Sequence, residues 1–330
     1  MQTQSDCKSA RHVVTPRRGD VPRCLSDGLP PGARVCVQGV EWGSVFQPGS
    51  AIGKYRVVQA LGRGRGDGLY LATDEDRRPF AIRAVVADLE GQPSIATRFL
   101  PDAVALRGFS NLNVVPMFDV LVDQGFLYVV CEHVRGRTLR QAISDSQLTA
   151  VESLVIIRQV LAAAAAAHAA GIVHRALQPS TVLLVPLQGW ELVKVADFGL
   201  ATLRDEAVLE FGTDALPDSP RTGAVAYMAP EQVRGRSVDQ RTDLYAIGTM
   251  LFEMLAGRPP FADSDPQLVM QLQLNATMPA IEDVCRGASW CGPEIITLVK
   301  TALAREREAR YQTAAQMNVA VDAAFRALTG

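Results

Sequence analysis

The sequence of 330 residues predicts an α+β fold in which a small β-rich lobe precedes a larger, mainly helical lobe. Alternation of apolar and polar residues, the period of a half-buried strand, dominates residues 54–134. Helical patterns dominate from residue 135 to about residue 328. The length agrees with two lobes, since a typical domain takes about 150 residues.

The first 50 residues are expected to form a flexible leader rather than part of the core. They contain many Pro, Gly, Ser and Arg residues, their apolar positions show no clear period, and the pairs at residues 30–31 and 48–49 mark loops. One short ordered piece is expected near residues 35–45. We therefore place the folded domain at residues 51–330.

Five strands and one helix are expected in the first lobe. Apolar residues, many of them β-branched or aromatic, make up each expected strand, and turn residues separate the strands. The expected strands span residues 55–61, 69–73, 80–86, 114–122 and 126–134, with a turn at Asp123, Gln124 and Gly125 and a short helix at residues 95–108.

The second lobe is expected to be helical apart from two short strands. The most apolar stretch, residues 154–173, contains Arg158 and His168 and is mostly alanine, so we expect a core helix rather than a membrane span. The expected helices span residues 138–144, 152–171, 243–255, 265–274, 293–304 and 314–328, and the strands span residues 180–185 and 193–197.

Composition argues against several classes of protein. The 33 Lys and Arg residues against 35 Asp and Glu give a net charge of −2, whereas a general nucleic-acid binder is usually strongly basic. The six cysteines lack the paired spacing of a zinc site, and Cys285 and Cys291, which flank Trp290, are assigned to packing. The N-terminus lacks the apolar core of a secretion signal, so a cytoplasmic protein without membrane insertion is expected.

A glycine-rich segment is the first candidate for ligand binding. Gly62, Gly64, Gly66 and Gly68 alternate there, and glycine allows backbone N–H groups to approach phosphates closely. A dinucleotide-binding turn would open a helix and a Walker loop would continue with Gly-Lys-Ser/Thr, but here a strand follows. A hairpin that folds over a nucleotide therefore fits better than either, and a plain flexible turn is the alternative.

Taken together, seven motifs resemble the protein kinase family, in particular the bacterial Ser/Thr kinases of eukaryotic (Hanks) type. In chain order they read LGRGRGDGLYLA, FAIR, HRALQPST, DFG, YMAPE, DLYAIG and ARYQTA, over about residues 54–328. The resemblance implies a two-lobed protein-kinase-like fold, with lobes at about residues 54–134 and 135–328. It also implies a nucleotide site made by Leu61, Gly62, Gly64, Leu69, Ala81, Arg83, Cys131, Glu132, Val134 and Leu183.

The resemblance further implies a magnesium ligand and a set of structural residues. Asp197, the first residue of DFG, would hold Mg²⁺ beside ATP. Glu231 would pair with Arg310, and Asp243 would anchor the loop that begins at His174. The remaining structural positions are Asp102, Leu106, Met117 and Phe198.

Five positions depart from the family pattern where phosphoryl transfer needs particular polar groups. The loop Asp that orients the substrate hydroxyl and accepts its proton is replaced by Ala176, and alanine has no group for either task. The loop Lys is replaced by Gln178, and the loop Asn that holds a second magnesium is replaced by Thr181. The Thr before YMAPE is replaced by Ala224, and the strand Lys that contacts the phosphates by Arg83.

These losses predict a pseudokinase that acts as a signalling scaffold or allosteric regulator through another protein, such as an active kinase or its substrate. Two alternatives stay open, and the oligomeric state is not predicted. A nucleotide sensor would bind ATP and Mg²⁺ without transferring phosphate. A weak or unconventional Ser/Thr kinase would need a replacement acid near Ala176, for which the sequence offers Asp205, Glu206 and Glu210.

The segment between DFG and YMAPE contains candidate phosphoacceptors for a partner kinase. By the resemblance, Arg175 would meet a phosphate on this segment. The alternative for Arg175 is an ordinary hydrogen-bonding role that ties the segment down. The candidates are Thr202, Thr213, Ser219 and Thr222.

Overall fold

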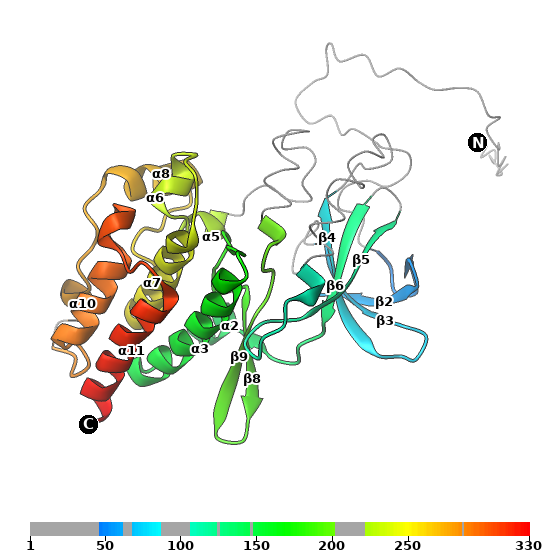
Figure 1. Ribbon diagram of the computed structural model, residues 1–330, viewed down its shortest axis with the longest axis horizontal. Coiled ribbons are helices and arrows are strands. Elements are labelled where there is room, and N and C mark those ends of the chain that lie inside the picture. The colour runs from blue at the N-terminus through cyan, green and yellow to red at the C-terminus, as the bar shows by residue number, and fades with distance from the viewer. Residues whose placement is uncertain are drawn as a thin grey trace, which may run out of the picture. The chain divides into compact units, whose positions relative to one another are not determined.

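The computed structural model describes a β-rich lobe up to Glu132 and a mainly helical lobe after it, so the predicted fold class is confirmed (Figure 1). The expected ordered piece near residues 35–45 and most of the helix expected at residues 95–108 lie outside the described part of the chain. The described residues are 46–61, 68–86, 106–123, 126–145, 148–201, 222–285 and 287–330.

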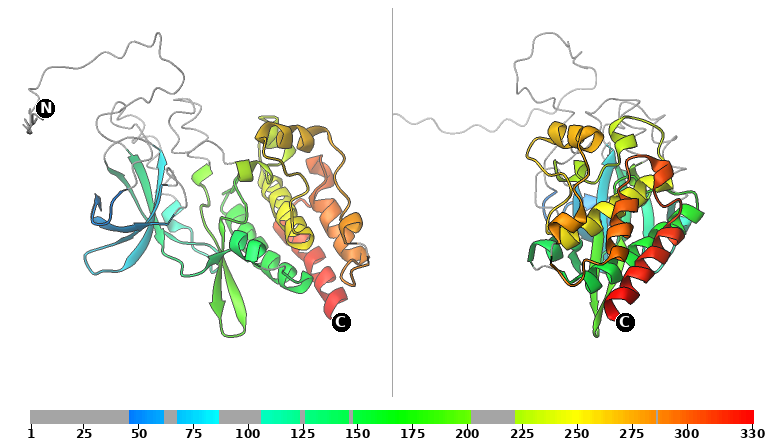
Figure 2. Two further views of the ribbon diagram at one scale, coloured as in Figure 1. Left: turned by 180° about the vertical axis from the view of Figure 1, so that it is seen from behind. Right: turned by 90° about the vertical axis from the view of Figure 1, so that its left-hand side faces the viewer.

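The first lobe is an antiparallel sheet of six described strands in the order β1-β2-β3-β4-β6-β5, which Figure 2 shows from behind. The five expected strands are present, and the short strand β1 extends one edge. A single turn of 3-10 helix, η1 (Leu106–Gly108), precedes β5. The strands are β1 (Ala51–Ile52), β2 (Tyr55–Ala60), β3 (Leu69–Thr73), β4 (Pro79–Val86), β5 (Met117–Asp123) and β6 (Phe126–Glu132).

The core of this lobe includes a residue that the sequence placed in the leader. The ring of Phe46 packs edge-on against Tyr70, with 5.4 Å between ring centroids, and against Tyr128, with 6.4 Å. Both tyrosines are buried in the lobe. An aromatic ring in such a contact belongs to the core of the fold, so the lobe begins before residue 51.

The second lobe combines a three-stranded sheet with nine described helices. The helices and strands expected there are present, with bounds that differ by a few residues. The strands are β7 (Arg137–Thr138), β8 (Val182–Leu187) and β9 (Trp190–Val195). The helices are α2 (Leu139–Asp145), α3 (Ala150–Ala169), α5 (Thr222–Val225), α6 (Pro230–Val233), α7 (Gln240–Ala256), α8 (Pro266–Asn275), α9 (Ile281–Val284), α10 (Pro293–Ala302) and α11 (Ala314–Thr329).

Helix α3, the alanine-rich stretch, is a core helix. It begins at a capping box in which Glu152 donates its backbone N–H to Thr149 Oγ1, and Thr149 donates its own to Glu152 Oε2. Ten of its side chains are buried, and it packs against α7 and α11. By length and composition alone it could cross a membrane, but packing within this lobe accounts for its apolar surface.

Helix α7 forms the centre of the second lobe. All 13 residues from 242 to 254 are buried. Helix α10 approaches it so closely at Gly248 that a Cβ there would lie 2.6 Å from the Cβ of Ala302, which leaves no room for a side chain. Groups attached to α7 are therefore held by the most rigidly packed part of the lobe.

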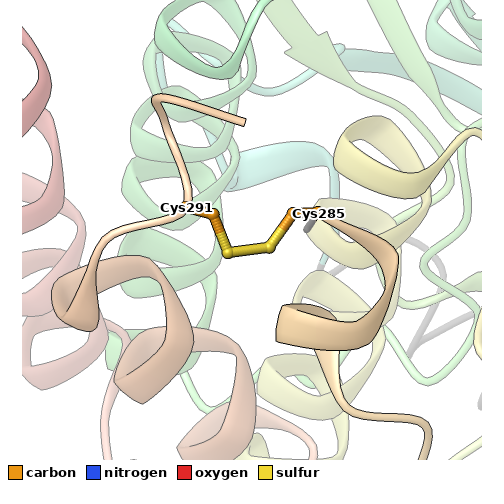
Figure 3. The surroundings of a disulfide bond; sticks show 2 residues. All are labelled: Cys285 and Cys291. Atoms are coloured by element: carbon orange, nitrogen blue, oxygen red, sulfur yellow. A yellow bond between two sulfur atoms is a disulfide. The ribbon is translucent and has the colours of Figure 1, made fainter. Parts of the chain in front are cut away.

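Cys285 and Cys291 are joined by a disulfide across the loop between α9 and α10 (Figure 3). Their Cα atoms lie 5.9 Å apart, a usual separation for a disulfide. The assignment of both cysteines to packing alone was therefore wrong. The two cysteines are 6 positions apart, a spacing that is typical of neither metal-binding nor redox motifs. The disulfide forms because the loop between α9 and α10 brings them together, and the sequence does not show the course of this loop.

We expect reduction of this disulfide to lower the melting temperature of the protein by several degrees. Closing so short a loop stabilises the folded state by about 2 kcal/mol in the chain-entropy model. The measurement is thermal unfolding with and without a thiol reductant. Cys285→Ala should be insensitive to the reductant, and Cys131→Ala, which keeps the disulfide, should remain sensitive. Equal melting temperatures of the unaltered protein in both conditions would contradict the expectation.

Candidate functional site

The residues expected to contact a nucleotide converge where strands β3, β4 and β6 lie side by side. Leu69 is the register partner of Arg83, and Ala81 is the partner of Cys131. Leu61 donates its backbone N–H to the carbonyl of Leu69 at 2.9 Å, which holds it at the end of the β2–β3 ladder. Two further residues of this set, Gly62 and Gly64, lie outside the described part of the chain.

Glu132 ends β6 and connects the two lobes through its side chain. Its carboxylate lies 2.6 Å from the Nζ of Lys194 on β9, and its backbone N–H donates to the carbonyl of Pro116. Lys194 is the register partner of Leu183, so the strand that carries Leu183 lies next to this connection. Val134 follows in irregular chain, where its backbone groups take part in no strand.

Cys131 presents a neutral thiol to this region. Burial raises the pKa of the thiol to about 12, with a smaller contribution from the Asp197 carboxylate that the Arg83 guanidinium partly offsets. The thiol is therefore un-ionised at neutral pH. Cys131 is the register partner of Ala81, two positions before Arg83 on β4, so the thiol and the Arg83 side chain lie on the same face of the sheet.

Arg83 on β4 and Asp197, which follows β9, form an ion pair that joins the two lobes. The distance from Arg83 Nε to Asp197 Oδ1 is 3.2 Å, and the side chains are 24% and 22% exposed. Asp197 adopts a φ of 69°, in the left-handed region that few residues other than Gly, Asn and Asp tolerate. The backbone at DFG is thus held in an uncommon conformation that turns the carboxylate toward Arg83.

Phe198 is buried beside His174, the first residue of the HRALQPST loop. Its ring centroid lies 4.7 Å from that of His174 and 6.1 Å from that of Phe109. Gly199 has a φ of 76°, and a Cβ there would lie 2.6 Å from Leu106, so only glycine fits. Of the other structural positions, Met117 begins β5 and is buried, whereas Asp102 lies outside the described residues.

The loop that begins at His174 is anchored to α7 by Asp243. The buried carboxylate accepts the backbone N–H groups of His174 and Arg175, both at 2.9 Å, and lies 2.8 Å from Nε2 of His168. His174 Nε2 lies 2.8 Å from the carbonyl of Ala196, immediately before DFG. Both oxygens of Asp243 are therefore occupied in holding the loop.

The polar groups further along the loop bond within the loop itself. The hydroxyl of Thr181 donates to the carbonyl of Gln178 at 2.9 Å and receives the N–H of Gln178 at 3.3 Å. The Thr181 carbonyl accepts the N–H of Ala196 at 2.8 Å. Ala176 is exposed, and its side chain offers a methyl group only. The hydrogen bonds that hold the loop are thus formed, and position 176 carries no polar side chain.

The YMAPE motif is tied to the core by a buried ion pair of its last residue, Glu231. Glu231 accepts two hydrogen bonds from Arg310, each at 2.8 Å, and a third from the hydroxyl of Thr242 at 2.8 Å. Burial alone would raise the pKa of Glu231, but the bonds and charge of Arg310 bring it below its ordinary value. This carboxylate is therefore ionised and paired at neutral pH.

The sequence reasoning missed a second cluster, in which Glu253 and Tyr227 are buried and Arg140 is partly exposed. Glu253 lies 2.6 Å from Arg140 Nη1 and accepts the hydroxyl of Tyr227, to which Arg140 also donates. Burial, and then the charge of Glu253, raises the pKa of the tyrosine, so it stays protonated. The three residues are up to 113 positions apart in the chain, so no local pattern reveals them.

Most of the segment between DFG and YMAPE lies outside the described residues. This holds for three candidate phosphoacceptors, Thr202, Thr213 and Ser219, and for the candidate acids Asp205, Glu206 and Glu210. The fourth phosphoacceptor, Thr222, begins the one-turn helix α5. Ala224 in the same turn accepts the backbone N–H of Tyr227 at 3.1 Å.

Comparison with known proteins identifies the family. The model of the protein kinase domain matches residues 55–320, which is most of the chain. The chain belongs to the protein kinase family. Both lobes described above fall within the matched range, as do the ion pairs formed by Arg83, Glu132 and Glu231.

The relatives of this kinase domain are bacterial proteins. It is 32% identical over 274 residues to the probable serine/threonine-protein kinase PknB of Corynebacterium glutamicum, covering 80% of this chain and 41% of that protein. It is 30% identical over 277 residues to the serine/threonine-protein kinase PrkC of Bacillus subtilis, covering 83% and 41%. The chain thus spans about two fifths of the length of these relatives.

The fold of this chain is similar to that of solved protein kinase structures. The PknI kinase domain of Mycobacterium tuberculosis has a TM-score of 0.64 at 21% identity, over 84% of this chain and 99% of that one. At this identity the likeness concerns the fold alone. The chain is accordingly a kinase-fold protein related to bacterial Ser/Thr kinases.

The described residues do not fit the pair of magnesium ions that protein kinases use. In the family the DFG Asp and the loop Asn hold the metals. Here Thr181 occupies the Asn position and its hydroxyl is bonded to Gln178, while Asp197 is paired with Arg83. Within the described ranges no group of three or more His, Cys, Asp or Glu side chains is placed to hold a metal.

We expect Arg310→Ala to lower the free energy of unfolding by about 3–5 kcal/mol, because it leaves the buried carboxylate of Glu231 without its partner. The matched control is Arg158→Ala, which removes a half-exposed ion pair with Asp322 and should cost less than about 1 kcal/mol. Urea unfolding of both variants gives the comparison, and equal losses would contradict it.

The cost of Arg310→Ala should also depend on pH. Pairing with Arg310 lowers the pKa of Glu231 in the folded state. The ion pair therefore stabilises the fold fully above pH 4.5, the ordinary pKa of a glutamate, and this stabilisation is lost as the pH falls through the lowered pKa. The stability gap between the unaltered protein and the variant should therefore narrow in acid. If the difference in stability between the two proteins instead widened from neutral pH to pH 4, a group other than Glu231 would determine its pH dependence.

Proposed function

We propose that this protein is a pseudokinase: a kinase-fold regulator that acts by binding another protein and transfers phosphate inefficiently or not at all. Phosphoryl transfer depends on positioning and on charge neutralisation, so the loss of several positioning groups removes most of the catalytic means. The partner chemistry that fits best is a second protein, such as an active kinase or its substrate. The balanced charge of the chain argues against a nucleic acid.

The observation that carries the proposal is the state of the carboxylates around the catalytic loop. Position 176 has no acid, and Asp243, which contacts the loop, uses both oxygens to hold it. Asp197 is paired with Arg83 across the cleft. Neither carboxylate is placed to receive the proton of a substrate hydroxyl, and a positioned general base is worth about 10²–10⁴ in rate.

Three of the replaced polar residues would contact one another in the family. Their joint replacement supports the interpretation that phosphoryl transfer is no longer used, whereas a single replacement could be tolerated. In the family resemblance the loop Asp and Lys meet the Thr that precedes YMAPE, and these positions are Ala176, Gln178 and Ala224. The surrounding architecture is retained, including the anchor at Asp243 and the pair of Glu231 with Arg310. Retention of the scaffold without the chemistry is the pattern expected of a binding protein.

We expect the purified protein to transfer no phosphate to itself or to a generic basic substrate, with either Mg-ATP or Mn-ATP. Incorporation of labelled phosphate should equal that of the matched control, Asp197→Ala. This variant lacks the carboxylate that the resemblance assigns to Mg²⁺. Transfer clearly above this control would instead favour the weak-kinase alternative, with an acid supplied from the segment after DFG.

Restoring the loop acid alone should not restore activity. Ala176→Asp supplies a base, but Gln178 and Ala224 still lack the groups that would position it and neutralise the phosphate. We expect Ala176→Asp to stay near background, and the combination with Gln178→Lys and Ala224→Thr to exceed it. Recovery of an ordinary kinase rate of about 1–100 s⁻¹ from the single change would show that the three losses are independent.

A further inference from the structure

The hairpin formed by β8 and β9 carries two large apolar side chains at an exposed tip. Leu187 ends β8, Trp190 begins β9, and the two are register partners across a two-residue turn. Register partners in an antiparallel pair point to the same face, so these side chains stand side by side. Leu187 is 44% exposed and Trp190 is 51% exposed. The hairpin projects beyond α3 (Figure 1), so strand pairing holds the tip in place while solvent reaches it.

An apolar hollow of about 600 Å³ adjoins this tip. Trp190 lines one part of it. Alanine side chains line much of the rest, namely Ala162 and Ala165 from α3 and Ala314 and Ala315 from α11. Methyl groups leave room for a larger side chain, and an apolar group that enters the hollow gains from its removal from water.

Polar groups at the base of the hairpin are bonded within the chain. The amide of Gln159 donates to the carbonyl of Glu191 at 3.0 Å and accepts the N–H of Val193 at 2.9 Å. Asn113 donates to the carbonyl of Val193 at 2.9 Å. Strand β9 is an edge strand of its sheet, and these bonds use backbone groups that an added strand would need. This surface therefore offers side-chain packing rather than strand pairing.

The charged residues around the hollow are paired with each other. Arg158, which lines the hollow, lies 2.9 Å from Asp322, and Arg137 lies 3.3 Å from Glu191. These four side chains together carry no net charge. A strongly acidic or basic partner would find no complementary charge here, and two copies of the surface would not repel each other.

We propose that this surface, formed by the β8–β9 tip, α3 and α11, binds a second copy of the chain in a two-fold dimer. Leu187 and Trp190 of each copy would pack against the alanine-lined hollow of the other. Both halves of the contact lie on one surface, as a two-fold interface requires, because such a surface meets itself. The proposal is independent of the loss of phosphoryl transfer, since it uses no residue of the HRALQPST loop or of DFG.

The test is sedimentation equilibrium of the full chain at concentrations from about 1 µM to about 100 µM. We expect the average mass to rise from 35.6 kDa toward twice that value and no further. A chain that stays monomeric over this range overturns the proposal. So does growth beyond the dimer, because a two-fold contact closes on itself.

Trp190→Ala identifies the surface that is used. We expect the variant to raise the dissociation constant of the dimer by about thirtyfold or more, since buried aromatic side chains dominate most interfaces. The matched control is Phe118→Ala, which removes an aromatic side chain of similar exposure, 46%, from the first lobe and should leave the dimer intact. A dimer that persists in Trp190→Ala, or that dissociates only in Phe118→Ala, overturns the proposal.

A second variant tests whether Trp190 meets the hollow of the other copy. Ala162→Glu places a charge in the hollow at an exposed position of α3, and we expect it to dissociate the dimer as well. A mixture of Trp190→Ala with Ala162→Glu retains one intact contact of the two. The mixture should therefore associate more tightly than either variant alone, and association no tighter than theirs overturns the proposal.

Discussion

The catalytic-loop geometry depends on the buried carboxylate of Asp243. It sits in the first turn of α7, the most deeply packed helix, and receives donors from two backbone N–H groups and contacts His168 at the end of α3. A buried carboxylate is costly without such partners, and with them it fixes three segments in one place. It also holds Arg175 at a φ of 63°, a conformation that a free loop would leave.

This anchoring explains how the loop keeps its shape although alanine stands at position 176. Asp243 and His174 bond to backbone groups of the loop and of the residue before DFG, and Glu231 bonds to the side chain of Arg310. None of these bonds involves the side chain at position 176. The side chain at position 176 is exposed and bonds to nothing in the fold. Alanine in place of the family's loop acid therefore costs little stability, and folding alone does not require an acid at position 176.

Local patterns predicted the elements well, and they failed where the structure depends on distant contacts. Alternation located each main strand of the first lobe, because half-buried strands repeat every two residues. Phe46 was missed since its partners Tyr70 and Tyr128 lie on strands far along the chain. The disulfide of Cys285 with Cys291 was missed for a different reason, because a loop path decides which cysteines meet.

The same difference between local patterns and distant contacts applies to the candidate site. Motifs located the positions of Arg83 and Asp197, but the direct pairing of the two side chains is a three-dimensional fact that the sequence left open. The resemblance assigned Arg83 to contact with a nucleotide and Asp197 to Mg²⁺, so it gave no reason to expect a direct bond between the two side chains. Arginine makes the observed pair feasible, since its guanidinium is larger than an ammonium group and hydrated more weakly.

Pairing within the cleft also changes what holds the lobes together. Arg83 with Asp197 and Glu132 with Lys194 join the lobes, and the N–H of Val115 donates to the carbonyl of Val195 at 2.9 Å. In a kinase that binds Mg-ATP, phosphates and metal neutralise the charged groups of the cleft, so the ligand supplies part of this connection. Here Arg83 and Asp197 neutralise each other, so side chains of the protein itself supply this connection.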